Sequence, residues 1–339
     1  RRQRQMCIRD SIITTGELLI DFTPVKAPGT ENAVCPNPGG APGNVAVQLA
    51  RLGVPAGFIG KVGDDSFGRS LKSCLEENGV DVGGVVVDEN VRTTLAFVHL
   101  DKEGDRSFTF YRDPGADTQL REDEVDKSAL EECKALHFGS LSLTTEPSRT
   151  TTLNLVKEAR AMGRMISYDP NWRPALWRDA EKGIEAMGLG LELCHVLKIS
   201  EEELALLTGT DSIAEGARAL HEKGVALAIV TLGPDGCVSS LKGQLRHHPT
   251  YDVKVVDTTG SGDSFWGAFL SQLIQNGYDA PEKLPSLSQE ELAGFCRFAN
   301  AAGSMCASKP GGIPAIAGRE DILRCMEETD ILETDFRLI

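Results

Sequence analysis

DTTGSGDSFWGAF, residues 257–269, combines two acids, a glycine-rich turn and the start of an amphipathic helix. Phe265, Phe269 and Leu273 recur at helical spacing, so Asp263 is expected in the first turn of that helix. Glycines ahead of a helix let several backbone N–H groups point at one spot, where the helix dipole adds positive charge. This stretch predicts an anion hole with a carboxylate at its rim. A purely structural helix start capped by an acid has the same pattern, and the stretch alone does not separate the two.

Strands and helices alternate along most of the remaining chain. Apolar runs that are typical of strands occur at 12–22, 56–63, 135–140, 165–170, 195–199, 226–232 and 236–242. Helical patterns separate most of these runs, which predicts an α/β fold with a doubly wound, mostly parallel central sheet flanked by helices. In open sheets of this kind ligands bind beyond the carboxyl ends of the strands, so the polar loops that follow the strands should meet in one cleft.

Two segments break the alternation and predict a small β lid. Residues from about 23 to 36 are rich in Pro and Gly, and residues 93–112 alternate apolar and polar positions around a turn at KEGD (102–105). At the N-terminus, RRQRQMCIRDS (1–11) is basic and polar before an abrupt apolar strand. We expect these eleven residues to be a non-native extension, and residues 12–339 to form one domain that carries the lid.

Composition excludes several classes of function. The net charge of −15 and the pI near 4.9 argue against nucleic-acid binding through a basic surface. No apolar run approaches the ~18 residues of a membrane span. The nine cysteines include no CxxC pair, which favours buried free thiols in a reducing cytoplasm over disulfides or a metal site.

Two common nucleotide-binding motifs are missing from the sequence. There is no GxxxxGK[ST], and the first strand-to-helix turn contains GELLID (16–21) in place of a GxGxxG fingerprint. What remains is an acid, a backbone anion hole and polar strand ends, the minimum for transferring a phosphoryl group to an alcohol. In such chemistry the acid accepts the hydroxyl proton, while backbone donors worth typically ~3 kcal/mol each stabilise the transferred charge.

Several stretches resemble the ribokinase-like (PfkB) family of carbohydrate kinases. DTTGSGDSF resembles the C-terminal signature of that family, which usually has Ala where Ser261 stands. The other matches, in family order and spacing, are PGGAPGNVAVQLARLG (38–53), KVGDDSFG (61–68), TLGPDG (231–236) and FANAAGSMCASKPG (298–311). Within the family, GELLIDF (16–22) and DPNWRPALW (169–177) are most similar to bacterial and plant fructokinases.

The resemblance implies roles for individual residues. Asp263 matches the catalytic base, and the backbone of Gly260, Ser261 and Gly262 matches the anion hole. The candidates for substrate binding are Asp21, Gly40, Asn44, Phe97, Phe110, Arg112, Asp169 and Arg173.

These substrate candidates differ in kind. The two phenylalanines are expected to close the lid over the sugar. Arg112 could instead meet phosphate or only decorate the lid, and Asp169 and Arg173 could equally belong to a structural network at a strand end.

The nucleotide-binding positions implied by the resemblance are Lys198, Ser200, Glu203, Thr231, Gly233, Gly236 and Asn300. Ser200 stands where many members have Asn, so its contact could be weaker or pass through water. Glu203 is expected to act on magnesium indirectly, although a glutamate in a run of three is more often a solvated helix face. Asp257 and Thr259, with backbone carbonyls near 306–311, match the family's monovalent-cation site.

The sequence therefore predicts an ATP-dependent kinase that needs Mg²⁺ and binds K⁺, with fructose as acceptor and fructose 6-phosphate as product. The alternatives are 2-keto-3-deoxygluconate, ribose or a nucleoside as acceptor, or a non-catalytic sugar-binding regulator on the same fold. We further expect a cytoplasmic homodimer that pairs through the lid and binds neither nucleic acid nor membrane.

Overall fold

A nine-stranded sheet forms the centre of the molecule in the computed structural model, which describes residues 11–25, 33–100 and 106–338. Its strands, in spatial order, are β13 (Gln244–His248), β12 (Cys237–Leu241), β11 (Leu227–Thr231), β10 (Val196–Ser200), β9 (Met165–Asp169), β8 (Ala135–Gly139), β1 (Ile12–Thr15), β4 (Ala56–Gly63) and β5 (Asp81–Asp88). Neighbouring strands run parallel except for the two antiparallel pairs that β12 makes with β11 and β13. The predicted doubly wound, mostly parallel sheet is confirmed.

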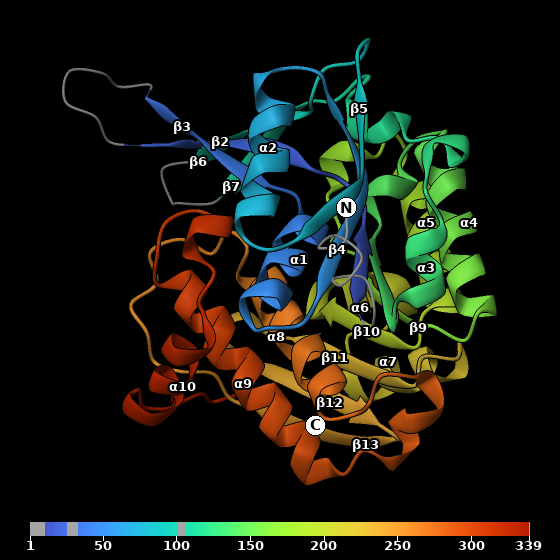
Figure 1. Ribbon diagram of the computed structural model, residues 1–339. Helices are drawn as coiled ribbons and strands as arrows, with labels where there is room; N and C mark the ends of the chain where they lie inside the picture. Colours follow the sequence, from blue (N-terminus) through green and yellow to red (C-terminus); the bar gives the residue numbers. More distant parts are fainter. Residues whose placement is uncertain (1–10, 26–32, 101–105, 339) are drawn as a thin grey trace.

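Helices cover both faces of this sheet because successive residues of its strands point to opposite sides (Figure 1). Ile12 packs into one apolar cluster and Ile13 into the other. The first cluster lies under α1 (Ala41–Arg51), α2 (Ser66–Glu77), α8 (Ser261–Gln275), α9 (Gln289–Ala307) and α10 (Arg319–Glu328). The second lies under α3 (Ser128–Glu132), α4 (Ser148–Ala161), α5 (Ala180–Leu193), α6 (Glu201–Thr208) and α7 (Ile213–Glu222).

A second, four-stranded sheet projects beside the central one (Figure 1). We call it the small sheet; its order is β3 (Val34–Gly39), β2 (Leu19–Pro24), β6 (Leu95–Leu100) and β7 (Arg106–Tyr111). It occupies the segments in which the lid was expected. The expected KEGD turn (102–105) and most of the expected N-terminal extension lie outside the described residues.

The prediction of one strand over 12–22 is wrong. The run consists of β1 in the central sheet and β2 in the small sheet, separated at Gly16, whose φ of 151° lies in a region that favours glycine. Periodicity could not reveal this break because the residues on both sides of it are buried without alternation. Asp21 consequently lies on the small sheet rather than at the end of a central strand.

The edge strand β13 (Gln244–His248) is not among the strands predicted from the sequence. Its sequence, QLRHH, has few apolar residues to mark it.

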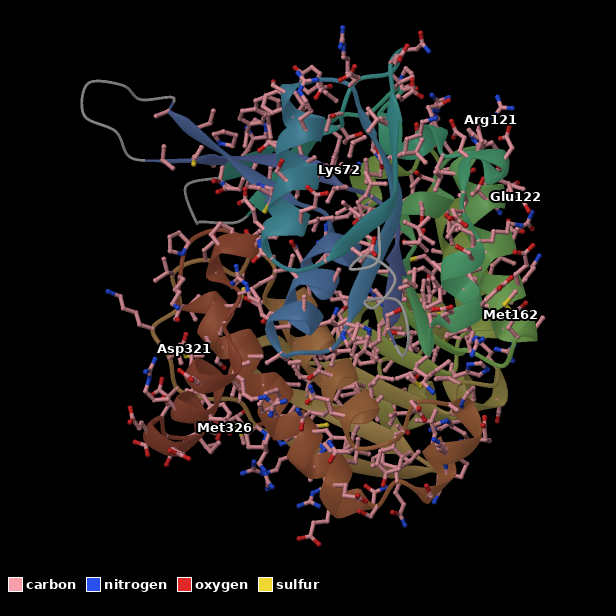
Figure 2. The ribbon with its side chains drawn as sticks, in the orientation of Figure 1. Lys72, Arg121, Glu122, Met162, Asp321 and Met326 are labelled. Atoms are coloured by element: carbon pink, nitrogen blue, oxygen red, sulfur yellow. The ribbon has the colours of Figure 1, made fainter. Side chains whose placement is uncertain are left out.

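At the surface, Arg121, Glu122 and Asp321 lie on the outside of the molecule (Figure 2). Within the described ranges, none of the helices combines the length and apolarity that crossing a bilayer requires.

Two glycines of α5 give a matched test of the packing beneath the central sheet. A Cβ on Gly190 would lie 2.3 Å from the buried ring of Tyr168, which stacks on Phe138, whereas a Cβ on Gly188 would meet nothing within 4 Å. We expect Gly190→Ala to lower the free energy of unfolding by ~1–3 kcal/mol. Gly188→Ala should leave it unchanged or raise it by up to ~1 kcal/mol. Urea unfolding of both variants provides the measurement, and equal effects would contradict this packing.

Candidate active site

A cavity of about 420 Å³ lies between the small sheet and the carboxyl ends of the central strands. Twelve of the predicted site residues line it: Asp21, Gly40, Asn44, Phe110, Arg173, Lys198, Ser200, Glu203, Thr259, Gly260, Gly262 and Asp263. The other nine are not part of its wall: Phe97, Arg112, Asp169, Thr231, Gly233, Gly236, Asp257, Ser261 and Asn300. Chain segments more than 200 residues apart therefore meet here, as the loop argument predicted.

The glycine turn shapes one end of the cavity. Gly260 is the N-cap of α8 and has a left-handed φ of 77°, a conformation that glycine adopts without steric cost. The amide of Ser261 donates to the Thr258 carbonyl at 3.2 Å and closes the turn. The amides of Gly262 and Asp263 belong to the first helical turn, which has no intrahelical acceptors for them. These two amides and the positive end of the helix dipole meet at one corner of the cavity, and such a corner suits an anion.

Asp263 lies half-buried at this corner. Its Oδ2 accepts a hydrogen bond of 2.7 Å from Asn44 Nδ2, which comes from the first turn of α1. Burial raises the pKa of Asp263 to about 6, while the bond from Asn44 opposes the rise. The nearby charges of Lys198 and Arg173 also oppose it. At neutral pH the side chain is therefore a carboxylate, held ready to accept a proton.

Lys198 supplies positive charge at the same corner. Its Nζ donates to Asp169 Oδ2 at 2.7 Å, and a Cβ placed on Gly262 would lie 3.4 Å from that Nζ. Burial alone would lower the pKa of Lys198, but Asp169 and Glu203 outweigh it and the pKa is raised, so the ammonium stays charged. Asp169 lies behind Lys198 and positions it; the prediction that Asp169 contacts the substrate is not supported by this placement.

Glu203 ties two loops together at the mouth of the cavity. Its Oε2 accepts from the Ser200 amide at 2.8 Å, and the Ser200 hydroxyl accepts from the Glu203 amide at 3.1 Å, which makes a capping box for α6. Its Oε1 accepts from the Trp172 amide at 2.6 Å. The Arg173 side chain next in sequence reaches the cavity wall, with its guanidinium 5.9 Å from the centre of the Phe108 ring.

The small sheet contributes Asp21 and Phe110 to the cavity, but Phe97 faces away from it. In the antiparallel β6–β7 ladder Phe97 pairs with Thr109 and Ala96 with Phe110, so the two phenylalanines point to opposite faces. Phe97 stacks on Phe22 at 4.7 Å between ring centroids. The prediction of Phe97 as a substrate contact is wrong because hairpin register could not be read from the sequence.

Arg112 is also displaced from its predicted role. Its Nε donates to Asp117 at 2.8 Å, its Nη1 to Thr144 at 2.8 Å and its Nη2 to the Leu141 carbonyl at 2.9 Å. With only 9% of its surface exposed, it is an internal cation that fixes the chain behind the cavity.

The remaining candidates for nucleotide binding lie outside the cavity wall. Thr231 pairs in register with Ser200, which does line the cavity. Gly236 has a φ of 85°, and a Cβ there would lie 2.2 Å from the His248 carbonyl. Asn300 donates to that same carbonyl and to that of Pro249, both at 3.0 Å. Asn300 therefore holds the turn at His248 and Pro249, where β13 ends.

The loop at Asp257 lies against the end of α9. The amides of Val256 and Asp257 donate to the Ala307 carbonyl at 2.8 and 3.1 Å, and Asp257 Oδ2 accepts from the Gly311 amide at 2.9 Å. Asp257 Oδ1 accepts from the Thr259 amide at 2.8 Å. Both carboxylate oxygens of Asp257 thus accept backbone amides, which ties the glycine turn to the segment after α9.

Known proteins are similar to this chain in both fold and sequence. The model of the pfkB family carbohydrate kinases matches residues 9–317. The chain belongs to this family.

Fructokinase-1 of Oryza sativa subsp. japonica is 41% identical over 321 residues, which cover 93% of this chain and 97% of the rice protein. The fructokinase of Xylella fastidiosa with bound ATP superposes with a TM-score of 0.86 at 33% identity, covering 94% of this chain and 98% of that one. The fructokinase of Vibrio cholerae O395 has a TM-score of 0.84 at 32% identity, with 94% and 99% coverage. Its structures contain fructose, ADP and calcium or, in a double mutant, fructose, ADP and potassium.

Within this pfkB site, sequence reasoning missed Glu17. Glu17 lines the cavity beside Asp21 and is 2% exposed, and burial raises its pKa to about 7. The signal was available, because Glu17 is an acid within an apolar run, where charge is costly unless it has a purpose. The pKa of Asp21 is raised in the same way. Burial raises it to about 7, and the positive charge of Arg173 opposes the rise.

The buried charge of Asp263 should reduce stability in the ligand-free protein. Its pKa rises from 3.8 to about 6 on folding, so the stabilisation that this group provides is present below pH 3.8 and is lost as pH rises through about 6. Asp263→Asn removes the charge and can still accept the Asn44 bond. We expect a gain of up to ~3 kcal/mol in unfolding free energy at pH 8, shrinking by pH 5. Thermal unfolding at both pH values, with the exposed Asp123→Asn as control, provides the measurement; an equal gain at both pH values would contradict the argument.

Proposed function

We propose that this protein is an ATP-dependent fructokinase, which transfers the γ-phosphoryl group of ATP to the primary hydroxyl of fructose and releases fructose 6-phosphate and ADP. One observation supports this most strongly. Asp263 shares a corner with two helix-terminal amides and Lys198, while the opposite wall presents Asp21 and Phe110. A base and an anion site thus adjoin a wall suited to a sugar, with carboxylate for the hydroxyls and an apolar ring for the carbon face.

The proposed mechanism assigns one task to each part of this corner. Asp263 accepts the proton of the primary hydroxyl, whose oxygen forms a bond to the γ-phosphorus as the bond to the β,γ-bridging oxygen breaks. The amides of Gly262 and Asp263 and the ammonium of Lys198 stabilise the charge on the transferred group. Asn44 orients Asp263, and Asp21 accepts hydroxyl hydrogen bonds from the sugar. Closure of the small sheet as a lid excludes water that would otherwise accept the phosphoryl group.

We assign Mg²⁺ to the nucleotide phosphates rather than to a protein cage. The described residues include no group of three or more His, Cys, Asp or Glu that could hold a metal ion. Glu202 and Glu203 line the cavity near Lys198, and the two Glu203 oxygens already accept amides, so any contact of Glu203 with the ion would pass through water. When bound, the ion neutralises phosphate charge. We place K⁺ at Asp257, beside the Ala307 carbonyl, where a bound cation would steady the glycine turn.

The acceptor is the point on which alternatives differ. A kinase for 2-keto-3-deoxygluconate needs a cation for the substrate carboxylate, and Arg173 is an arginine on the cavity wall. Buried carboxylates at Asp21 and Glu17 instead favour a neutral polyol, since they repel an acid. A panel of sugars that includes fructose, ribose and 2-keto-3-deoxygluconate, in an assay coupled to ADP release, separates these substrates.

Asp263→Asn tests the base directly. We expect it to lower kcat on fructose by at least ~10³-fold because the hydroxyl proton loses its acceptor, while ATP and fructose still bind. In the wild type, kcat should fall as pH drops through about 6, where the carboxylate becomes protonated. Steady-state kinetics and calorimetric binding measure these effects, with Asp123→Asn as the exposed control. Turnover within tenfold of wild type would overturn the assignment.

We further propose a cytoplasmic homodimer that pairs through the small sheet. Eight of the nine cysteines are described and all eight are free thiols, which suits a reducing compartment. The small sheet exposes Val25 and Val34 at 43% each and Tyr111 at 65%, and its edge strands β3 and β7 have no further strand beside them among the described residues. Exposed apolar edges of this kind favour pairing with another chain.

Light scattering coupled to size exclusion tests the dimer. We expect twice the chain mass for the wild type and a shift toward the single-chain mass for Tyr111→Asp, because a charge would be buried in the interface. Leu323→Asp changes another exposed apolar position, on α10, and should leave the mass unchanged. A wild type that elutes as a single chain at micromolar concentration would contradict the proposal.

A further inference from the structure

Glu17 has a carboxylate oxygen that the protein leaves without a partner. Its Oε1 accepts from the Ala41 amide at 2.9 Å and so anchors the start of α1. Its Oε2 is buried and, among the described residues, makes no hydrogen bond. A buried acceptor without a donor costs ~1–3 kcal/mol, so its retention at the cavity wall calls for a ligand that donates.

A second acceptor in the same wall has the same need. Asn44 uses its Nδ2 to donate to Asp263, and its Oδ1 is buried with no partner among the described residues. Glu17 and Asn44 flank Gly40, and both line the cavity with Asp21. Unpaired acceptors grouped at one wall match a molecule with several adjacent hydroxyl donors rather than a single water or an anion.

Arg112 does not supply the missing donor to Glu17 Oε2. Arg112 is close enough to affect Glu17 electrostatically, but its guanidinium already donates to Asp117, Thr144 and the Leu141 carbonyl. The lining residue Leu19 offers no donor from its side chain. Among the described residues no protein group donates to this oxygen, although Glu17 lines the cavity.

We propose that Glu17 is a substrate-binding residue whose Oε2 accepts a hydrogen bond from a fructose hydroxyl, beside the acceptors of Asn44 and Asp21, and that it determines selectivity for the polyol. This inference rests on the proposed fructokinase function. A site built to accept from a hydroxyl discriminates strongly against an analogue that lacks it, because the acceptor is then left unpaired. Glu17 therefore has two functions. Its Oε1 fixes the start of α1 through the Ala41 amide, and its Oε2 accepts a hydrogen bond from the sugar.

Glu17→Gln separates these two functions. The amide oxygen can still accept from Ala41, whereas the NH₂ group replaces an acceptor with a donor. At pH 8, above the pKa of about 7 for Glu17, we expect the KM for fructose to rise 10- to 100-fold and the KM for ATP to stay within twofold. Calorimetric binding of fructose should weaken by the same factor. Glu132→Gln, an exposed change of the same kind on α3, should alter neither constant.

Deoxy analogues of fructose complete the test. In the wild type, one analogue should lose at least tenfold in affinity relative to fructose, and in Glu17→Gln that difference should disappear. Fructose binding by Glu17→Gln at wild-type strength, or an undiminished penalty for every analogue, would overturn the proposal. Glu17→Asp, which withdraws the carboxylate by one methylene, serves as the second variant, and thermal unfolding checks that each variant folds. If neither folds, the carboxylate belongs to the fold and the proposal fails.

The wild-type measurement keeps the two proposals apart. A wild type that does not phosphorylate fructose refutes the proposed function itself. A wild type that does so, with Glu17→Gln unaffected, refutes only the role of Glu17.

Discussion

The hydrogen bond between Asn44 and Asp263 joins the two ends of the site. It spans 219 positions of sequence in 2.7 Å and connects the first turn of α1 to the first turn of α8. Behind it, Ser264 donates to Gln48 Oε1 at 2.6 Å, so the same two helices are tied again one turn deeper. Both helices begin at glycines with positive φ, and at Gly40 a Cβ would lie 2.4 Å from the Glu17 carbonyl. A Cβ on Gly267 would lie 2.7 Å from Gln48 Cβ, so a small residue on α8 allows the two helices to approach, and the polar bonds fix how they face each other.

Charge balance at this junction explains why so many acids tolerate burial. Glu17, Asp21 and Asp263 each have a pKa raised by burial into the range of about 6 to 7. Lys198 and Arg173 supply the opposing charge, with Lys198 held by Asp169. Such a site is less stable without ligands than an apolar one of the same size, a common consequence of building a reactive centre. The hydroxyls of a sugar and the phosphates of a nucleotide are the groups that complete it.

The sequence predicts the central sheet and the glycine turn at Asp263 because both depend on local signals. The glycine turn, the helix after it and the apolar strands are each encoded within about 15 residues. The errors at Phe97 and Arg112 have a different origin, since one depends on hairpin register and the other on a partner, Asp117, in a short helical turn. The break at Gly16 and the edge strand β13 escaped because burial and pairing, rather than composition, define them. Glu17 escaped because it lies on the crossing between the two sheets, which the linear pattern does not show.

The stretch GELLIDF (16–22) therefore does more than start the fold. It leaves the central sheet at Gly16, crosses to the small sheet and carries Glu17 and Asp21 to the same cavity on the way. Oε1 of Glu17 also accepts from the Ala41 amide, so the segment that leads into β2 is bonded to the start of α1, the helix that carries Asn44. The same short stretch thus joins the small sheet to the helix whose Asn44 donates to Asp263. The residues proposed to bind the acceptor and the residue that orients the base therefore belong to one hydrogen-bonded unit.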